Sequence, residues 1–122
     1  EPQLVDIVDE SLMAGLSCGE VSLLGWQILK PGARHFMTIS DAPVAPLMQL
    51  LASGVSGDSP IVAGESAIAG LAGLIGAMRD EPLAQEMNLD AQSRVLVFGT
   101  EGATDPEVFE ALVGTSAEMI AA

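Results

Sequence analysis

The stretch RVLVFGTEGATDPEVFEALVG, Arg94 to Gly114, decides the predicted fold. An apolar run, Val95 to Phe98, stops at a small polar turn that contains two glycines. A helix is predicted after Asp105-Pro106, because Asp105 or the preceding Thr104 can serve as its N-cap and proline suits its first position. In open parallel sheets, ligands bind outside the carboxyl ends of the strands. The turn after the apolar run is therefore a candidate binding site.

Composition limits the classes of protein that this chain can belong to. Its 122 residues are enough for one domain with a real core, and 49% of them are apolar. Seventeen Asp and Glu against four Lys and Arg give a net charge of −13, so phosphate backbones and anionic lipid surfaces would repel it. Neither nucleic acid nor a membrane is an expected partner. The single cysteine, Cys18, and an opening without a basic, apolar targeting segment favour the cytoplasm.

Apolar periodicity and turn signals predict helices and strands in alternation. Helices are predicted over residues 21–30, ended by Pro31-Gly32, over 44–53, capped by Asp41, and over 66–79, where many residues are small. Short strands are predicted over residues 35–40, 61–64 and 95–98. This alternation predicts an α/β fold with a mostly parallel sheet.

Two further segments match known functional motifs only in part. GESAI, residues 64–68, occupies a predicted strand-to-helix turn, as a nucleophile elbow does, but Ile68 stands where that motif has glycine, and His35 lies upstream. DESLM, residues 9–13, is similar to the serine attachment site of acyl carrier proteins, but those are helical bundles with no place for VLVFG. One His, one Cys and scattered carboxylates have no spacing typical of a metal site.

Three segments, in the same order, resemble the C-terminal part of the diaminopropionate ammonia-lyase family, within the tryptophan-synthase-like pyridoxal-phosphate enzymes. They are MAGLSCGEVS (residues 13–22), IVAGESAIAGLAGL (61–74) and VLVFGTEGATDP (95–106). The resemblance covers most of residues 13–114. It implies that residues 1–122 form a single partial domain, a partial three-layer sandwich from a tryptophan-synthase-beta-like large domain. It also implies pyridoxal 5'-phosphate as the cofactor of the intact enzyme, a small amino acid as substrate, and a homo-oligomer, expected as a homodimer, that includes the rest of the parent chain.

The resemblance assigns four residues of this chain to cofactor binding. In the family, a Ser or Thr hydroxyl in a glycine-containing turn at a strand end hydrogen-bonds the pyridine nitrogen of the cofactor, which maps to Thr100, with Gly102 in the same turn. A glutamate before the small-residue helix maps to Glu65, and the loop around Gly15 would approach the ring face. Threonine suits elimination because its neutral hydroxyl can donate to an unprotonated nitrogen, whereas aspartate would hold the nitrogen protonated.

Two parts that the family needs for catalysis are not in the matched region: the Schiff-base lysine and the glycine-rich phosphate loop. The only lysine, Lys30, is expected at the end of a helix, so no catalytic residue is assigned and the chain alone is expected to be inactive. The function implied for the parent enzyme is elimination of ammonia from 2,3-diaminopropionate to give pyruvate. A threonine or serine dehydratase relative stays open, as does a non-catalytic module that binds a partner through its acidic surface.

Overall fold

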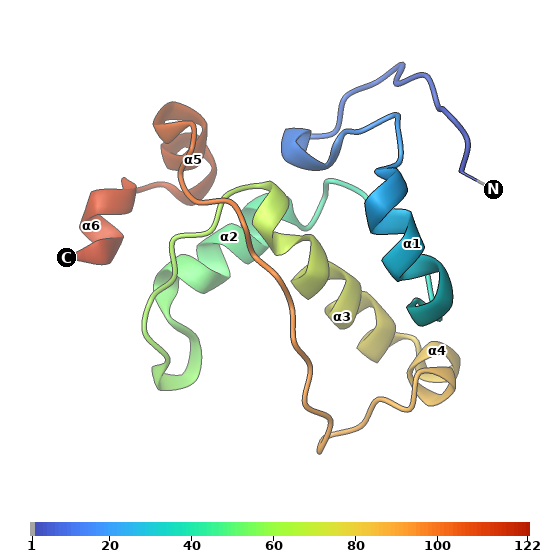
Figure 1. The fold of residues 1–122 in the computed structure, drawn as a ribbon. Coiled ribbons are helices and arrows are strands. Elements are labelled where there is room, and N and C mark those ends of the chain that lie inside the picture. The colour runs from blue at the N-terminus through green and yellow to red at the C-terminus, as the bar shows by residue number, and fades with distance from the viewer. Residues whose placement is uncertain (1) are drawn as a thin grey trace.

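The computed structural model describes residues 2–122 as helices joined by irregular segments (Figure 1). The α-helices of this part of the chain are α1 (Leu23–Gly32), α2 (Val44–Ser53), α3 (Ala69–Arg79), α4 (Glu81–Glu86), α5 (Pro106–Val113) and α6 (Ala117–Ala121). Short 3-10 turns are η1 (Ala14–Leu16), η2 (Val55–Gly57) and η3 (Ser66–Ile68). No helix among these is both long and apolar enough to cross a bilayer.

Most of the predicted helices are confirmed. α2 has the predicted bounds, η3 and α3 together cover the predicted helix over residues 66–79, and α5 follows Asp105, which is its N-cap. The predicted end of the first helix is wrong, because α1 continues through Pro31. A proline in the last turn removes a single backbone donor, and the helix ends one residue later. The short helices α4 and α6 were not predicted.

The predicted α/β sandwich with a mostly parallel sheet is wrong, because residues 2–122 contain no β-strand. A strand is held by backbone hydrogen bonds to a neighbouring strand. The predicted strands at 35–40 and 95–98 make no such bonds within the described part of the chain. The segment at 61–64 makes two isolated ones, from Ile61 to the carbonyl of Leu51 and from Gly64 to that of Glu101. The fold of these residues is therefore helical.

Two of the three irregular segments pack on α3 instead of pairing with each other. Residues 95–98 run along α3 (Figure 1). A Cβ placed on Gly70 would lie 3.2 Å from the Cβ of Val97, and one on Gly73 would lie 2.9 Å from Sδ of Met37. The small residues of α3 thus allow both segments to approach it closely, as the sequence predicted.

The core lies between α2, η3, α3 and α5. Its largest fully buried side chains are Phe109, Met48, Ile68 and Val44. Gln49 Nε2 donates to the backbone carbonyl of Leu112 at 2.7 Å, which joins α2 to the last turn of α5. These contacts hold α2 and α5 together. The TEGATD turn leads into α5, and the start of α3 packs against α2.

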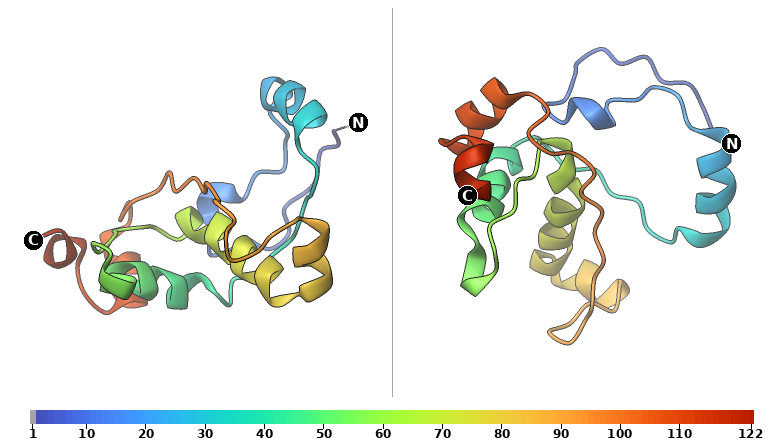
Figure 2. Two further views of the ribbon diagram at one scale, coloured as in Figure 1. Left: turned by 90° about the horizontal axis from the view of Figure 1, so that it is seen from below. Right: turned by 60° about the vertical axis from the view of Figure 1, so that its left-hand side comes forward.

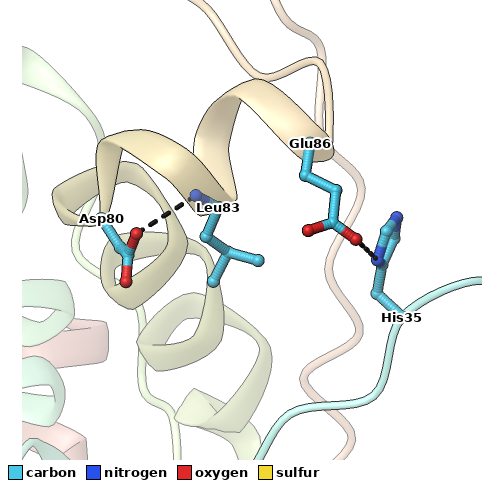
Figure 3. Close-up of polar contacts among 4 residues, drawn as sticks. All are labelled: His35, Asp80, Leu83 and Glu86. Atoms are coloured by element: carbon cyan, nitrogen blue, oxygen red, sulfur yellow. Dashed lines mark hydrogen bonds and ion pairs between the residues drawn. The ribbon is translucent and has the colours of Figure 1, made fainter.

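A carboxylate makes a polar contact at each end of α4 (Figure 3). Asp80 Oδ1 caps the helix by accepting from the backbone N–H of Leu83 at 3.1 Å. Glu86 Oε1 lies 3.8 Å from Nδ1 of His35, which links α4 to the segment before α2. The His35 and Glu86 side chains are 38% and 70% exposed, so this pair adds little stability.

The sequence predicted that Asp41 caps α2. This is wrong, because Pro43 is the N-cap and no side chain caps the helix. The carboxylate instead accepts from Ser11 Oγ at 2.6 Å and from the backbone N–H of Leu12 at 2.7 Å. It therefore holds the segment leading to η1 against the start of α2. The hydrogen bond from Ser11 and then that from Leu12 lower the pKa of Asp41 below its ordinary value.

Large apolar side chains are exposed in two regions. α1 stands away from the other helices (Figure 2) and buries no residue. An open apolar groove of about 540 Å³ lies over α3, and its lining includes Met37, Ile39, Gly73, Val97 and Phe98. Exposed apolar surface of this kind is typical of a face that another polypeptide covers.

We expect the 122-residue chain to self-associate and to bind a hydrophobic dye, because Leu96 and Phe98 line the groove and are each 77% exposed. Sedimentation velocity over a concentration series and dye fluorescence measure the two effects. Replacing both residues by serine should reduce both signals. Met119→Ser, at a comparably exposed position on α6, is the matched control. A compact monomer at high concentration that binds no dye would contradict this expectation.

The lowered pKa of Asp41 predicts a pH-dependent stability. The contribution of Asp41 to stability is fully present above its unfolded-state pKa of about 3.8 and is lost as the pH falls through its lower folded-state pKa. We expect Asp41→Asn to be less stable than the parent chain near neutral pH and to lose this difference in acid. Urea unfolding at a series of pH values from neutral to acid measures this difference in the free energy of unfolding. Asp58→Asn, at an exposed position, is the control. A difference that stays constant with pH would refute the assignment.

Candidate cofactor-binding site

Three segments that are far apart in the sequence meet at the N-terminal end of α3. They are η1, the turn that leads from Gly64 into η3, and residues 99–103. Figure 1 shows the chain between α4 and α5 crossing the start of α3. These segments belong to the three sequence motifs that carry the family resemblance.

Glu101 joins two of these segments through both its backbone and its side chain. The N–H of Gly64 donates to the carbonyl of Glu101 at 3.0 Å. The N–H of Ser66 donates to Oε2 of the half-buried Glu101 carboxylate at 2.5 Å. Ser66 Oγ in turn accepts from the N–H of Gly15 at 3.1 Å, which adds η1 to the network. A continuous chain of contacts therefore runs from Gly15 through Ser66 to Glu101.

The closeness of these segments requires glycine at Gly64 and leaves little room for a side chain at Gly15. A Cβ on Gly64 would overlap the carbonyl oxygen of Gly102 and would lie 2.7 Å from Cγ of Glu101. A Cβ on Gly15 would lie 2.8 Å from Ser66 Oγ. Real Cβ atoms essentially never come within 3.0 Å of such neighbours. Any other residue at Gly64 would push the two turns apart, since backbone atoms cannot move aside as a flexible side chain can.

Thr100 and Gly102, both predicted to bind the cofactor, lie on the open side of this junction. Thr100 is exposed, and its hydroxyl makes no hydrogen bond within residues 2–122. Gly102 is also exposed, and a Cβ on it would meet no atom within 4 Å. Its carbonyl accepts from the N–H of Thr104 at 2.9 Å, so the turn is internally ordered. The Thr100 hydroxyl is therefore available to a molecule outside this chain.

The other two predicted residues, Gly15 and Glu65, lie close to the same junction. Gly15 contacts Ser66 directly, and Glu65 is the half-buried residue before it, at the start of η3. The roles of these residues in cofactor binding stay predictions. Sequence reasoning missed Glu101 and Ser66 as the residues that tie the segments together. Neither residue carries a local sequence signal for this role, because each bond joins it to a segment 51 or 35 residues away.

The chemistry of the junction suits a neutral hydrogen-bond acceptor better than a phosphate. Thr100 presents an uncharged O–H, and the three segments contain neither Lys nor Arg. The apolar groove over α3 reaches Phe98, and its lining includes neither Thr100 nor Glu65. The polar turn and the apolar groove are therefore neighbouring but separate features.

Comparison with known proteins identifies relatives of this chain. No family model matches it. It is 36% identical over 107 residues to diaminopropionate ammonia-lyase of Salmonella typhimurium, which covers 84% of this chain and 26% of the relative. It is 35% identical over 115 residues to diaminopropionate ammonia-lyase of Escherichia coli K12, which covers 91% and 29%. The chain thus spans less than a third of the length of these curated relatives.

Two solved structures share the course of the backbone. The crystal structure of diaminopropionate ammonia-lyase from Escherichia coli in complex with an aminoacrylate-PLP azomethine reaction intermediate matches with a TM-score of 0.76 and 36% identity, over 88% of this chain and 29% of that one. The same enzyme in complex with D-serine matches with a TM-score of 0.74 and 35% identity, over 86% and 28%. Over most of its length, this chain is homologous to diaminopropionate ammonia-lyase and corresponds to the C-terminal part of that enzyme.

Proposed function

We propose that this chain is the C-terminal portion of a pyridoxal-phosphate-dependent ammonia-lyase that removes ammonia from 2,3-diaminopropionate and gives pyruvate. The observation that carries the proposal is the homology to diaminopropionate ammonia-lyase over 84% to 91% of the chain. The relatives compared are ammonia-lyases, which favours this reaction over that of a threonine or serine dehydratase. We further infer that the intact enzyme is a cytoplasmic homo-oligomer, expected as a homodimer, in which the rest of the parent chain packs on this region.

Four residues of this chain would hold the cofactor: Thr100, Gly102, Gly15 and Glu65. Thr100 would donate its hydroxyl to the ring nitrogen, since that hydroxyl is exposed and has no partner within residues 2–122. Gly102 and Gly15 are exposed and add no side chain of their own at the approach to the junction. When bound, pyridoxal phosphate supplies an electron sink for the carbanion of the substrate. The neutral Thr100 hydroxyl places no charge beside the nitrogen, so it limits the sink and favours loss of a β leaving group.

Substitution of Thr100 in the intact enzyme tests this role. Thr100→Ala removes a hydrogen bond with a net worth of about 0.5 to 1.5 kcal/mol, so we expect elimination to slow by about 2- to 12-fold without loss of cofactor loading. Thr100→Asp should change the absorption spectrum, because a carboxylate would hold a proton on the ring nitrogen. Thr38→Ala, at an exposed position outside this turn, is the control. Wild-type spectra and rates in both Thr100 variants would reduce Thr100 to a turn residue.

A labelling experiment on the 122-residue chain tests whether its chemistry needs the rest of the enzyme. A cofactor-binding lysine requires an amine activated by desolvation or by a neighbouring cation. Lys30 is exposed in the last turn of α1, a helix that buries no residue. After incubation with pyridoxal phosphate and borohydride reduction, we expect mass spectrometry to find low, scattered labelling of Lys30 and the amino terminus, and no ammonia release from 2,3-diaminopropionate.

Lys30→Arg is the control for that experiment and should remove only its own minor share of the label. Stoichiometric labelling of Lys30 together with turnover would overturn the proposal that the catalytic lysine lies outside these 122 residues.

A further inference from the structure

We propose that Glu101 is a positioning residue that sets the conformation of the turn carrying Thr100, and so the direction in which the Thr100 hydroxyl meets the cofactor. The link from Glu101 to catalysis rests on the proposed function. The contacts of Glu101 within this chain do not rest on it. They are the hydrogen bonds from Gly64 to its carbonyl at 3.0 Å and from Ser66 to its carboxylate at 2.5 Å.

The position of Thr100 depends on these contacts because its own side chain has none. Thr100 is exposed and makes no side-chain hydrogen bond within residues 2–122. The residue after it is held at two points, so the peptide joining Thr100 to Glu101 has a fixed orientation relative to the start of α3. Hydrogen bonds to a charged acceptor are shorter and stronger than those between neutral groups. The carboxylate of Glu101 is therefore the strongest restraint on the Thr100 turn.

Glu101 also borders the second segment that is predicted to approach the cofactor. Its Oε1 lies 3.5 Å from the place where a Cβ on Gly15 would be. The N–H of Gly15 donates to Oγ of Ser66, the residue whose N–H the carboxylate accepts. One side chain thus fixes the spacing between the Thr100 turn and the Gly15 loop, the two segments expected to contact the cofactor ring.

A purely structural role for this carboxylate is the alternative. An acidic group at the N-terminal end of a helix stabilises the helix, and Ser66 opens the helical segment that continues as α3. A helix cap needs only a nearby residue, whereas Glu101 is 35 positions away from Ser66 in sequence. The two roles differ in their consequences: loss of a cap lowers stability alone, while loss of a positioning residue acts through Thr100.

The first experiment measures amide hydrogen exchange by NMR in the 122-residue chain without cofactor. We expect Glu101→Ala to speed exchange of the Ser66 and Gly15 amides by about 2- to 12-fold, the loss of one net hydrogen bond. Glu101→Gln keeps an acceptor oxygen at the same reach and should restore most of the protection. Glu110→Ala, at an exposed position on α5, is the matched control and should change neither amide. Unchanged exchange in Glu101→Ala would overturn the proposal.

The second experiment is a double-mutant cycle in the intact enzyme. We expect Glu101→Ala to lower kcat by about 2- to 12-fold with little change in KM, and to alter the cofactor spectrum as Thr100→Ala does. In the Thr100→Ala background, Glu101→Ala should cause no further fall in kcat, because its effect passes through Thr100. Glu101→Gln should stay near the wild-type rate.

The possible failures of this cycle can be told apart. Effects of the two substitutions on kcat that simply multiply would show that Glu101 is not a positioning residue for Thr100. If Glu101→Ala fails to fold, Glu101→Asp keeps the charge but shortens the reach, and a wild-type kcat and spectrum in that variant would overturn the proposal equally. A wild-type enzyme that neither binds pyridoxal phosphate nor releases ammonia refutes the proposed function itself, whatever the amide exchange shows.

Discussion

The close approach of two turns at Gly64 is the constraint on which the rest of this region depends. The carbonyl of Gly102 occupies the space that a side chain on Gly64 would need, and the N–H of Gly64 bonds the carbonyl of Glu101. Only at this separation can the carboxylate of Glu101 reach the N–H of Ser66. The junction lies at the core, because η3 contributes Ile68 to it and the chain after the turn enters α5, which contributes Phe109. Packing of the helices and spacing of the site are therefore coupled.

Local signals accounted for much of the helical structure. α5 was predictable because an aspartate, a proline and a first-turn glutamate mark its start. α4 carries comparable signals in Asp80 and Pro82, but at Glu81–Glu86 it is too short for apolar periodicity to reveal. Local signals could not decide whether the predicted strands pair into a sheet. In the segment at 95–98, Leu96 and Phe98 are more exposed than their neighbours, which is the two-residue alternation typical of a strand. That pattern indicates an extended segment with one covered face, but it does not say which backbone would pair with it.

The residues of the site were only partly predictable for a related reason. The motifs identified the segments, and the family resemblance supplied a role for Thr100. The bonds that hold the segments together join residues without local sequence signals. Asp41 illustrates this, since its position before α2 predicted a helix cap while its carboxylate binds Ser11 and Leu12, 30 and 29 residues away. Glu101 is a second case. A side chain that serves a distant segment looks, in the sequence, like any other charged residue in a turn.

The separation of these partners along the chain also bears on the order in which the structure forms. The bond between Gly15 and Ser66 spans 51 residues, and that between Ser66 and Glu101 spans 35. Helices such as α2 and α5 form through backbone hydrogen bonds between residues four positions apart. Each of the two long-range bonds, in contrast, carries the entropic cost of closing a long loop. We therefore expect such contacts to form late, after the transition state for folding of the helical core. Weakening them should therefore leave the folding rate nearly unchanged and accelerate unfolding, so the junction governs how long the folded state persists more than how quickly it is reached.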